Sequence, residues 1–232
     1  KEIIASADDY LYDPYIGGYK LNTDFHELKT ELGRMFGFAY GQKENGAVFS
    51  HMAVMYANAL YQRGFVKEGY KVIDTLYGHC SNFEKSRIYP GIPEYIGSNG
   101  RGLYHYLTGA ASWLLLTVLT EMYGVMGYYG NLKLEPKLTL EQFDENQEAY
   151  VNLVFADRRL LVVYRNPLRK EYGNYQINRI YINDSLYDSN YNSIHDTNLS
   201  ISNNSNGDSI ILRKDLVALS PSLEHKILVE LN

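Results

Sequence analysis

The hydrophobic residues of this chain follow two different periods, one before Gly130 and one after it. From residue 49 to residue 123 they recur every three to four positions, which is typical of helices. Beyond Gly130 they alternate with polar residues in short runs, which is typical of strands. The pattern therefore predicts a helical domain over residues 1–126 and a strand-rich domain over residues 127–232.

Three helices are expected in the first part. The first begins near Phe49 and ends at Arg63-Gly64, the second covers residues 66–77 and stops at Gly78, and the third covers residues 108–123. The third helix is apolar on nearly every side, so it is expected to be an inner helix of a multi-helix array, with further partner helices from upstream of this chain. Further upstream, capping side chains at residues 22–24 favour helical structure over residues 25–35.

A loop rich in Gly and Pro leads from Ile88 to the third helix, and its composition excludes regular structure before about Leu103. Thr108 and Gly109 follow, at the expected start of the helix. Free backbone N–H groups and the positive end of the helix dipole make such a start suitable for an anion. The simpler interpretation is that Thr108 only caps the helix, and the pair alone does not decide between the two.

The strand-rich part has short apolar runs separated by turn residues. The runs expected to be strands are 132–138, 151–155, 160–164, 177–182, 210–212 and 227–231. Regularly spaced strands of this kind are typical of a β-sandwich. The Asn/Ser tract over residues 202–209 is expected to be an exposed loop.

Composition narrows the function classes. The net charge is −5 with no basic run, which argues against a nucleic-acid partner. Cys80 is the only cysteine, which excludes an internal disulfide and favours a reducing, cytoplasmic location. The longest apolar run, residues 110–119, is too short to span a membrane. The 23 tyrosines are consistent with sugar-binding loops, or with a compositional habit alone.

Two segments carry a resemblance to a known family. They are Lys43-Glu44-Asn45-Gly46-Ala47-Val48-Phe49-Ser50-His51 and Tyr106-Leu107-Thr108-Gly109-Ala110-Ala111-Ser112-Trp113. In this order and context they resemble the C-terminal part of the inverting β-glucoside phosphorylases of glycoside hydrolase family 94. This family includes the cellobiose, chitobiose and 1,2-β-oligoglucan phosphorylases.

The resemblance implies both a fold and a site. Residues 1–126 would supply the last helices of an (α/α)6 catalytic barrel, and residues 127–232 would form a small antiparallel β-sandwich. His51, Thr108 and Gly109 match the positions of the family's phosphate-binding residues, which an Arg from further upstream completes. Inorganic phosphate would be a substrate, and neither a cofactor nor a metal ion is implied.

The resemblance to the family is weaker at the residues that would bind the sugar substrate. Glu94 and Arg101 on the Gly-rich loop, together with Glu44, are candidates for binding the substrate. Many relatives read Glu-Pro-Tyr where this chain has Pro93-Glu94-Tyr95, which is closer to the 1,2-β-oligoglucan branch. The family's general acid, an Asp, lies well upstream of Lys43, so the resemblance assigns that role to no residue of this chain.

The resemblance thus implies part of a longer enzyme that converts a β-linked gluco-oligosaccharide and phosphate to α-glucose 1-phosphate. The chain alone is expected to be inactive and to self-associate through its apolar helix faces, or to occur together with the rest of the enzyme. The enzyme is expected to be a homodimer. Two alternatives remain open. One is a hydrolase of similar barrel fold with Glu44 and Glu94 as its carboxylate pair. The other is a non-catalytic carbohydrate-binding or assembly module.

Overall fold

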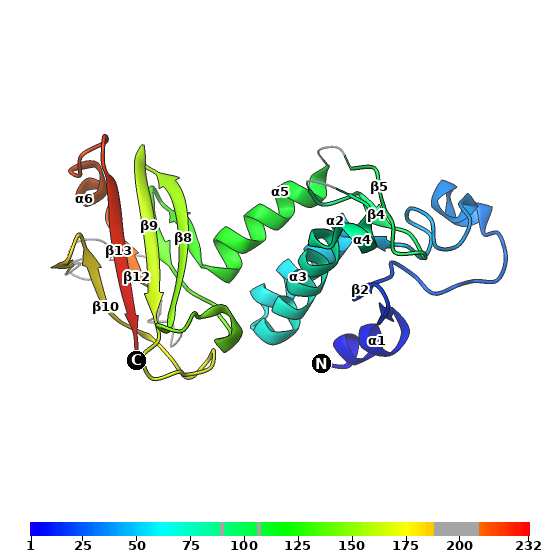
Figure 1. Ribbon diagram of the computed structural model, residues 1–232, viewed down its shortest axis with the longest axis horizontal. Coiled ribbons are helices and arrows are strands. Elements are labelled where there is room, and N and C mark those ends of the chain that lie inside the picture. Colours follow the sequence, from blue (N-terminus) through cyan, green and yellow to red (C-terminus); the bar gives the residue numbers. More distant parts are fainter. Residues whose placement is uncertain (89–90, 106–107, 188–208) are drawn as a thin grey trace, which may run out of the picture. The chain divides into compact units, whose positions relative to one another are not determined.

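The computed structural model describes residues 1–88, 91–105, 108–187 and 209–232 (Figure 1). The chain divides into two compact units, Lys1–Thr117 and Val118–Asn232. The boundary expected from the sequence, at 126/127, marks the change of hydrophobic period, whereas the compact units divide within the last helix before it. No helix of the described residues is long and apolar enough to cross a membrane.

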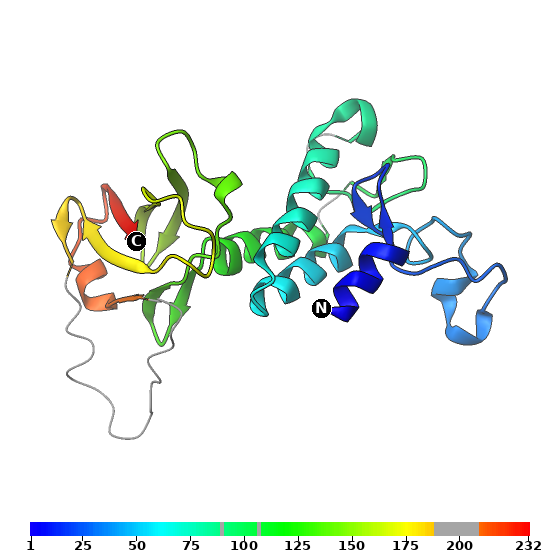
Figure 2. The ribbon, with the colours of Figure 1, turned by 90° about the horizontal axis from the view of Figure 1, so that it is seen from below.

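Two long helices pack against each other in the first unit. The helices and helical turns of this unit are α1 (Glu2–Tyr10), η1 (Thr30–Leu32), η2 (Arg34–Gly37), α2 (Ser50–Gln62), α3 (Val66–Ser81), α4 (Phe83–Ser86) and α5 (Gly109–Leu116). Figures 1 and 2 show α2 and α3 side by side. Helix α2 buries Ala53, Ala57 and Leu60, and α3 buries Val72, Leu76 and Cys80. The spacing of these residues is the helical period read from the sequence.

Helix α3 does not stop at Gly78, and that prediction is wrong. The helix continues to Ser81, because Cys80 extends its buried face by one more turn. Gly78 lies inside the helix on its exposed side, where a Cβ would meet no atom within 4 Å among the described residues. A glycine at such a position weakens a helix without ending it.

Two glycines of α3 make a matched pair for a stability test. We expect Gly78→Ala to stabilise the chain by about 0.5–1 kcal/mol, the usual helix preference for alanine over glycine. Gly69→Ala should instead destabilise it by about 1–3 kcal/mol, since its Cβ would lie 2.8 Å from Cδ2 of the fully buried Tyr61. Urea denaturation followed by circular dichroism measures both changes. Equal effects of the two substitutions would contradict the packing of α2 on α3.

The helix expected over residues 25–35 is wrong as well. The segment contains only the short turns η1 and η2, and neither contains a buried residue. Gly33 lies between them with φ of 105°, which breaks any continuous helix. Short helices gain most of their stability from packing an apolar face, and this segment has no buried face to pack.

The Gly-rich loop is more regular than its composition indicates. It contains β4 (Tyr95–Ile96) and β5 (Gly102–Leu103), which form a three-stranded antiparallel sheet with β3 (Val48–Phe49) before α2. A second small sheet pairs β1 (Tyr12–Asp13) with β2 (Gly18–Tyr19). The expectation of no regular structure before Leu103 is therefore wrong. The pairing brings the loop against the segment that leads into α2.

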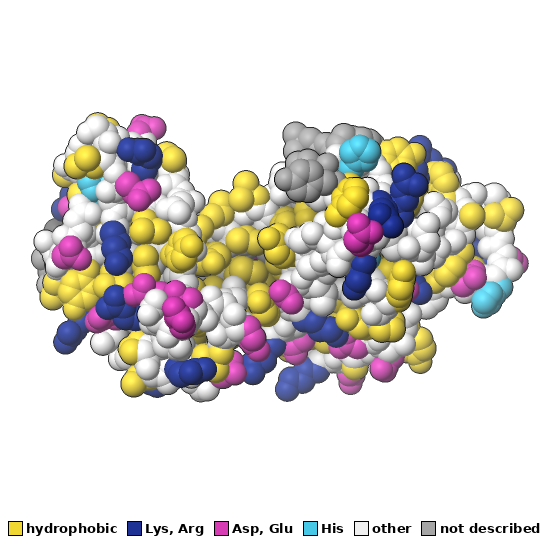
Figure 3. Space-filling model, viewed as in Figure 1, with side chains coloured by type: hydrophobic (Ala, Val, Ile, Leu, Met, Phe, Trp, Pro, Cys, Tyr) yellow, Lys and Arg dark blue, Asp and Glu magenta, His cyan; other side chains and the backbone are white. Residues whose placement is uncertain are grey.

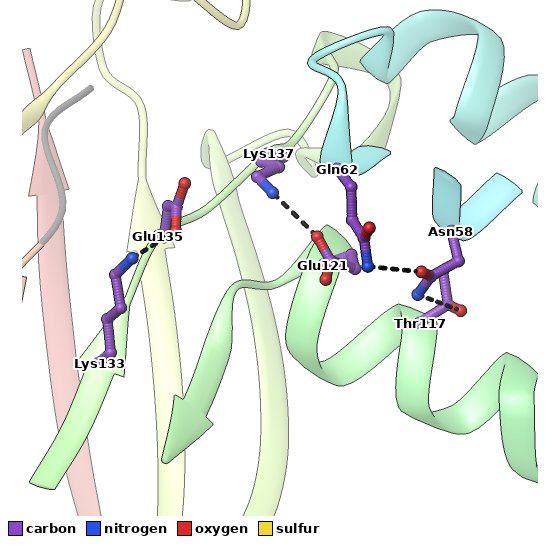
Figure 4. A network of polar contacts seen from close by, with 7 residues as sticks. All are labelled: Asn58, Gln62, Thr117, Glu121, Lys133, Glu135 and Lys137. Carbon is purple, nitrogen blue, oxygen red and sulfur yellow. Dashed lines mark hydrogen bonds and ion pairs between the residues drawn. The ribbon is translucent and has the colours of Figure 1, made fainter. Parts of the chain in front are cut away.

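The third predicted helix is present and changes its winding near the end. Helix α5 continues directly into η3 (Thr117–Met122), which is π-helical, and the Tyr123 N–H donates to the Val118 carbonyl at 2.9 Å. At the junction, Asn58 of α2 donates to the buried Thr117 hydroxyl at 3.1 Å, and its own oxygen accepts from Gln62 (Figure 4). This buried bond fixes α5 on α2.

Much of the apolar surface of α5 is exposed. Ala110 is the only buried residue among the described side chains of α5, whereas Leu115 and Leu116 are 62% and 48% exposed. Figure 3 shows hydrophobic side chains gathered in the region of this helix. The described residues of this chain therefore leave much of the apolar surface of α5 without a neighbour.

The second unit is built on two sheets. Its strands are β6 (Val125–Tyr128), β7 (Asn131–Leu134), β8 (Glu148–Phe155), β9 (Arg158–Arg165), β10 (Ile177–Ile182), β11 (Ser185–Leu186), β12 (Ser209–Ile211) and β13 (Glu224–Leu231), with the turn η4 (Leu140–Gln142) and the short helix α6 (Arg213–Val217). The strand orders are β11-β10-β13-β9-β8 and β12-β7-β6. Strand β13 runs parallel to β9, so the expectation of purely antiparallel pairing is wrong there.

Alternation along the strands places the core of this unit. In β13 the buried residues are His225, Ile227, Val229 and Leu231, and each is separated from the next by a more exposed residue. Three of the hairpins turn on two residues with positive φ, at residues 129–130, 156–157 and 183–184. Such turns match the right-handed twist of paired strands. The Asn183-Asp184 break read from the sequence is one of them, and most of the Asn/Ser tract (202–208) lies outside the described residues.

Candidate functional site

The segment before α2 is held by the side chain of Asn45. Its amide donates to the Phe38 carbonyl at 2.7 Å and its oxygen accepts from Asn22 at 3.1 Å. The oxygen of Asn22 in turn accepts from the Gly46 N–H at 2.9 Å. Gly46 has φ of 76°, a conformation that suits glycine. The Asn45-Gly46 turn therefore fixes the direction in which the chain enters α2.

His51 lies in the first turn of α2. The helix begins at Ser50, whose N–H donates to the Glu94 carbonyl at 2.9 Å. This bond ties the start of the helix to the Gly-rich loop. The Nε2 atom of His51 is buried and has no hydrogen-bond partner within the described part of the chain. A buried polar atom of this kind calls for an explanation, and an absent ligand is one.

Thr108 caps helix α5. Its backbone is extended, and its hydroxyl oxygen accepts from the Ala110 N–H at 3.3 Å. The capping interpretation of Thr108 therefore holds. Capping does not exclude a second role, because the oxygen accepts this bond while the hydroxyl hydrogen is still available to donate. Tyr106 and Leu107, which precede it in the second sequence segment, lie outside the described residues.

The imidazole of His51 packs directly on the backbone of Gly109. A Cβ built on Gly109 would lie 2.7 Å from Cε1, 2.9 Å from Nδ1 and 3.1 Å from Nε2 of the ring. Real Cβ contacts are not this short, so a side chain at this position would displace the imidazole from the helix backbone. Trp113, one turn further along α5, has its ring centroid 6.0 Å from that of His51. The structure thus brings together His51, Thr108 and Gly109 from two helices.

The candidate sugar-binding carboxylates lie in the neighbouring loops. Glu44 and Glu94 each have a buried Oε2 with no hydrogen-bond partner among the residues that the structure describes. The ammonium of Lys43 lies 4.1 Å from the centre of the Tyr104 ring. Desolvation lowers the pKa of Lys43, but the hydrogen bond to Tyr104 and the charges of Glu94 and Glu44 raise it above its ordinary value. Lys43 is therefore a stable cation beside two carboxylates.

Lys43 and Tyr104 also belong to this region, although the sequence does not identify either as a site residue. Both have positive φ, 48° and 57°, which is uncommon for side chains of this size. Strained backbone of this kind often accompanies function. The available signal was the position of Lys43 at the head of the first segment; nothing in the sequence marks Tyr104.

Arg101 is not brought to this cluster. It is exposed in a turn between β4 and β5, where its N–H donates to Asn99 at 3.1 Å and its carbonyl accepts from Gly97 at 3.0 Å. Within the described ranges, no hydrogen bond or ion pair joins its side chain to His51, Thr108 or Glu94. Cys80 is also apart from the site, and burial raises the pKa of its thiol to about 12, which leaves it protonated.

Comparison with known proteins gives the class: the chain is similar to glycoside phosphorylases, at low sequence identity. It is 23% identical over 180 residues to the solabiose phosphorylase of Paenibacillus borealis, over 74% of this chain and 23% of that protein. It is 27% identical over 145 residues to the N,N'-diacetylchitobiose phosphorylase of Vibrio proteolyticus, over 59% of this chain and 18% of that protein.

A third relative is the cellobionic acid phosphorylase of Neurospora crassa, which is 22% identical over 154 residues, or 59% of this chain and 19% of that protein. No family model matches the chain. The chain spans less than a quarter of the length of each of these three relatives.

Proposed function

We propose that the chain is the phosphate-binding part of an inverting glycoside phosphorylase. The observation that supports this most is the imidazole of His51 packed on Gly109 at the capped start of α5. The N-terminus of a helix attracts anions through its N–H groups and dipole. The Thr108 hydroxyl, the Gly109 N–H and a ring N–H of His51 would donate to one phosphate.

This arrangement fits the chemistry of phosphorolysis. An inverting hydrolase needs one carboxylic acid for the leaving oxygen and one carboxylate to activate water. Phosphate is already an anionic nucleophile, so the second carboxylate can be replaced by groups that hold phosphate in line with the anomeric carbon. A phosphate oxygen forms the new bond to that carbon, and the glycosidic oxygen leaves with a proton from the general acid. The product is α-glucose 1-phosphate.

We assign the general acid to no residue of this chain. The alignments cover less than a quarter of the relatives, and the proposed whole enzyme supplies the acid and the remaining phosphate contact from elsewhere. We propose a cytoplasmic homodimer that needs no metal ion or cofactor. The last helices of a barrel and a β-sandwich remain our proposal for the two units.

We propose that the two partly buried carboxylates, Glu44 and Glu94, bind the sugar substrate. The Oε2 atoms of Glu44 and Glu94, which have no hydrogen-bond partner in the described part of the chain, are acceptors that sugar hydroxyls could satisfy. Lys43 keeps both carboxyl groups near a positive charge. A β-linked gluco-oligosaccharide is the proposed substrate. Arg101 is kept as a peripheral candidate, because the loop that carries it also carries Glu94.

The same two carboxylates favour a second candidate, a hydrolase that uses Glu44 and Glu94 as acid and base. The deciding experiment incubates the complete enzyme with β-gluco-oligosaccharides, with and without phosphate. Release of glucose 1-phosphate only when phosphate is present supports the phosphorylase. Release of glucose at the same rate in both reactions supports the hydrolase. Binding without any product supports a non-catalytic carbohydrate-binding module.

A further inference from the structure

We propose that Trp113 is a positioning residue that fixes the orientation of the His51 imidazole. The proposal rests on the phosphate site proposed above. Trp113 follows Gly109 by four residues, so the two positions lie one above the other on the same face of α5. His51 comes from the other helix, α2, and its ring contacts both positions.

Two features of α5 determine where the imidazole lies: the absence of a side chain at Gly109 and the large side chain of Trp113. At Gly109 the absence of a Cβ lets the imidazole approach the helix backbone. At Trp113 the indole lies 6.0 Å from the imidazole, centroid to centroid, and is tilted by 49°. Tilted pairs at this distance are among the favoured arrangements of aromatic rings. The imidazole thus lies across one turn of α5, with backbone at one end of the turn and the indole at the other.

Packing has to fix this ring, because hydrogen bonding does not. Nε2 of His51 is buried, and no hydrogen bond of the imidazole occurs among the residues described by the structure. A histidine usually owes its orientation to a bond made by one ring nitrogen, which leaves the other for the ligand. Here the indole takes over that role.

A positioning role predicts an effect on phosphate alone. In the complete enzyme, Trp113→Leu should raise the KM for phosphate by about threefold to tenfold, the range expected from the loss of an aromatic pair. The KM for the oligosaccharide should stay unchanged, and Trp113→Phe should restore most of the loss. Tyr77→Leu, which removes a 62% exposed aromatic ring from α3, is the matched control and should change neither value. Equal changes in both KM values would overturn the proposal.

A double variant separates this proposal from the one on which it rests. If Trp113 acts through His51, then Trp113→Leu adds no further loss to His51→Ala. Additive losses would overturn the positioning role while leaving the phosphate site in place. If His51→Ala itself leaves the KM for phosphate unchanged, the phosphate site fails, and the positioning role fails with it.

The chain itself offers a measurement that needs no activity, because Trp113 is its only tryptophan. The fluorescence of the 232-residue protein therefore reports the environment of this one indole. The measurement uses chains that keep Trp113, so it does not depend on whether Trp113→Leu folds. We expect His51→Gln to change the emission intensity in the absence of phosphate, since it replaces the ring in contact with the indole. An emission unaffected by His51→Gln would overturn the contact and, with it, the positioning role.

Discussion

Replacing His51 by alanine in the complete enzyme is expected to lower kcat/KM for phosphate by about 10²- to 10³-fold. That is the usual effect of removing one preorganised donor to a reacting anion. The imidazole packs on Gly109 at the start of α5, so its loss would remove a contact to the nucleophile and none to the sugar. The KM for the oligosaccharide should therefore change little. Initial rates measured over a range of both substrate concentrations separate the two effects.

The control for this prediction is another histidine of the same chain. His26 lies in an exposed turn, with 86% of its side chain accessible, so His26→Ala should leave both KM values unchanged. His51→Gln is the conservative variant and should retain part of the phosphate affinity, because its amide can still donate. Equal losses toward both substrates in His51→Ala would indicate a folding defect or a sugar contact, and would refute a role confined to phosphate.

The second large effect is expected at Gly124, in the strand-rich unit. Its φ is 62°, and a Cβ there would lie 1.9 Å from the Glu135 carbonyl oxygen and 2.1 Å from its carbon. The Glu135 N–H donates to the Gly124 carbonyl at 2.8 Å, so the two backbones are already in register and cannot separate without losing this bond. We expect Gly124→Ala to destabilise the chain by about 3 kcal/mol or more, because the left-handed conformation and the backbone clash add.

Gly173→Ala isolates the conformational part of that cost. Gly173 also has positive φ, 89°, but a Cβ there would meet no atom of the described residues within 4 Å. Gly173→Ala should lower the free energy of unfolding by only about 1–2 kcal/mol, which is the cost of holding alanine in the left-handed conformation. Urea denaturation followed by circular dichroism compares the two variants under the same conditions. Similar losses of unfolding free energy in the two variants would contradict the close contact between the backbones of Glu135 and Gly124.

Local features of the site could be read from the sequence. Thr108 predicts a helix start because a short hydroxyl side chain caps free N–H groups, and that depends only on its neighbours in the chain. The Asn45-Gly46 turn and the entry into α2 are of the same kind. The sequence also points to His51, Thr108 and Gly109 together, but through a family resemblance and not through any spacing between them. Their contact could not be derived from the pattern of residues.

The errors made from the sequence have a common cause. Residues 25–35 carry helix-capping signals and yet form only short turns, because no buried face supports a longer helix. The Gly-rich loop forms two strands because β3 offers them a partner. Helix α3 passes through Gly78 because Cys80 is buried beyond it. In each case the presence or the absence of packing against other residues outweighed the local preference.

The sequence by itself determined the helices α2, α3 and α5, the strand-rich second half and the capped start of α5. These follow from hydrophobic period and from capping, which act between residues close together in the chain. Only the tertiary structure decided that β13 runs parallel to β9, that α5 ends in a π-helical turn, and that His51 packs against Gly109 and Trp113. Those arrangements depend on contacts between residues far apart in the chain, and their partners are identified only once the elements have packed.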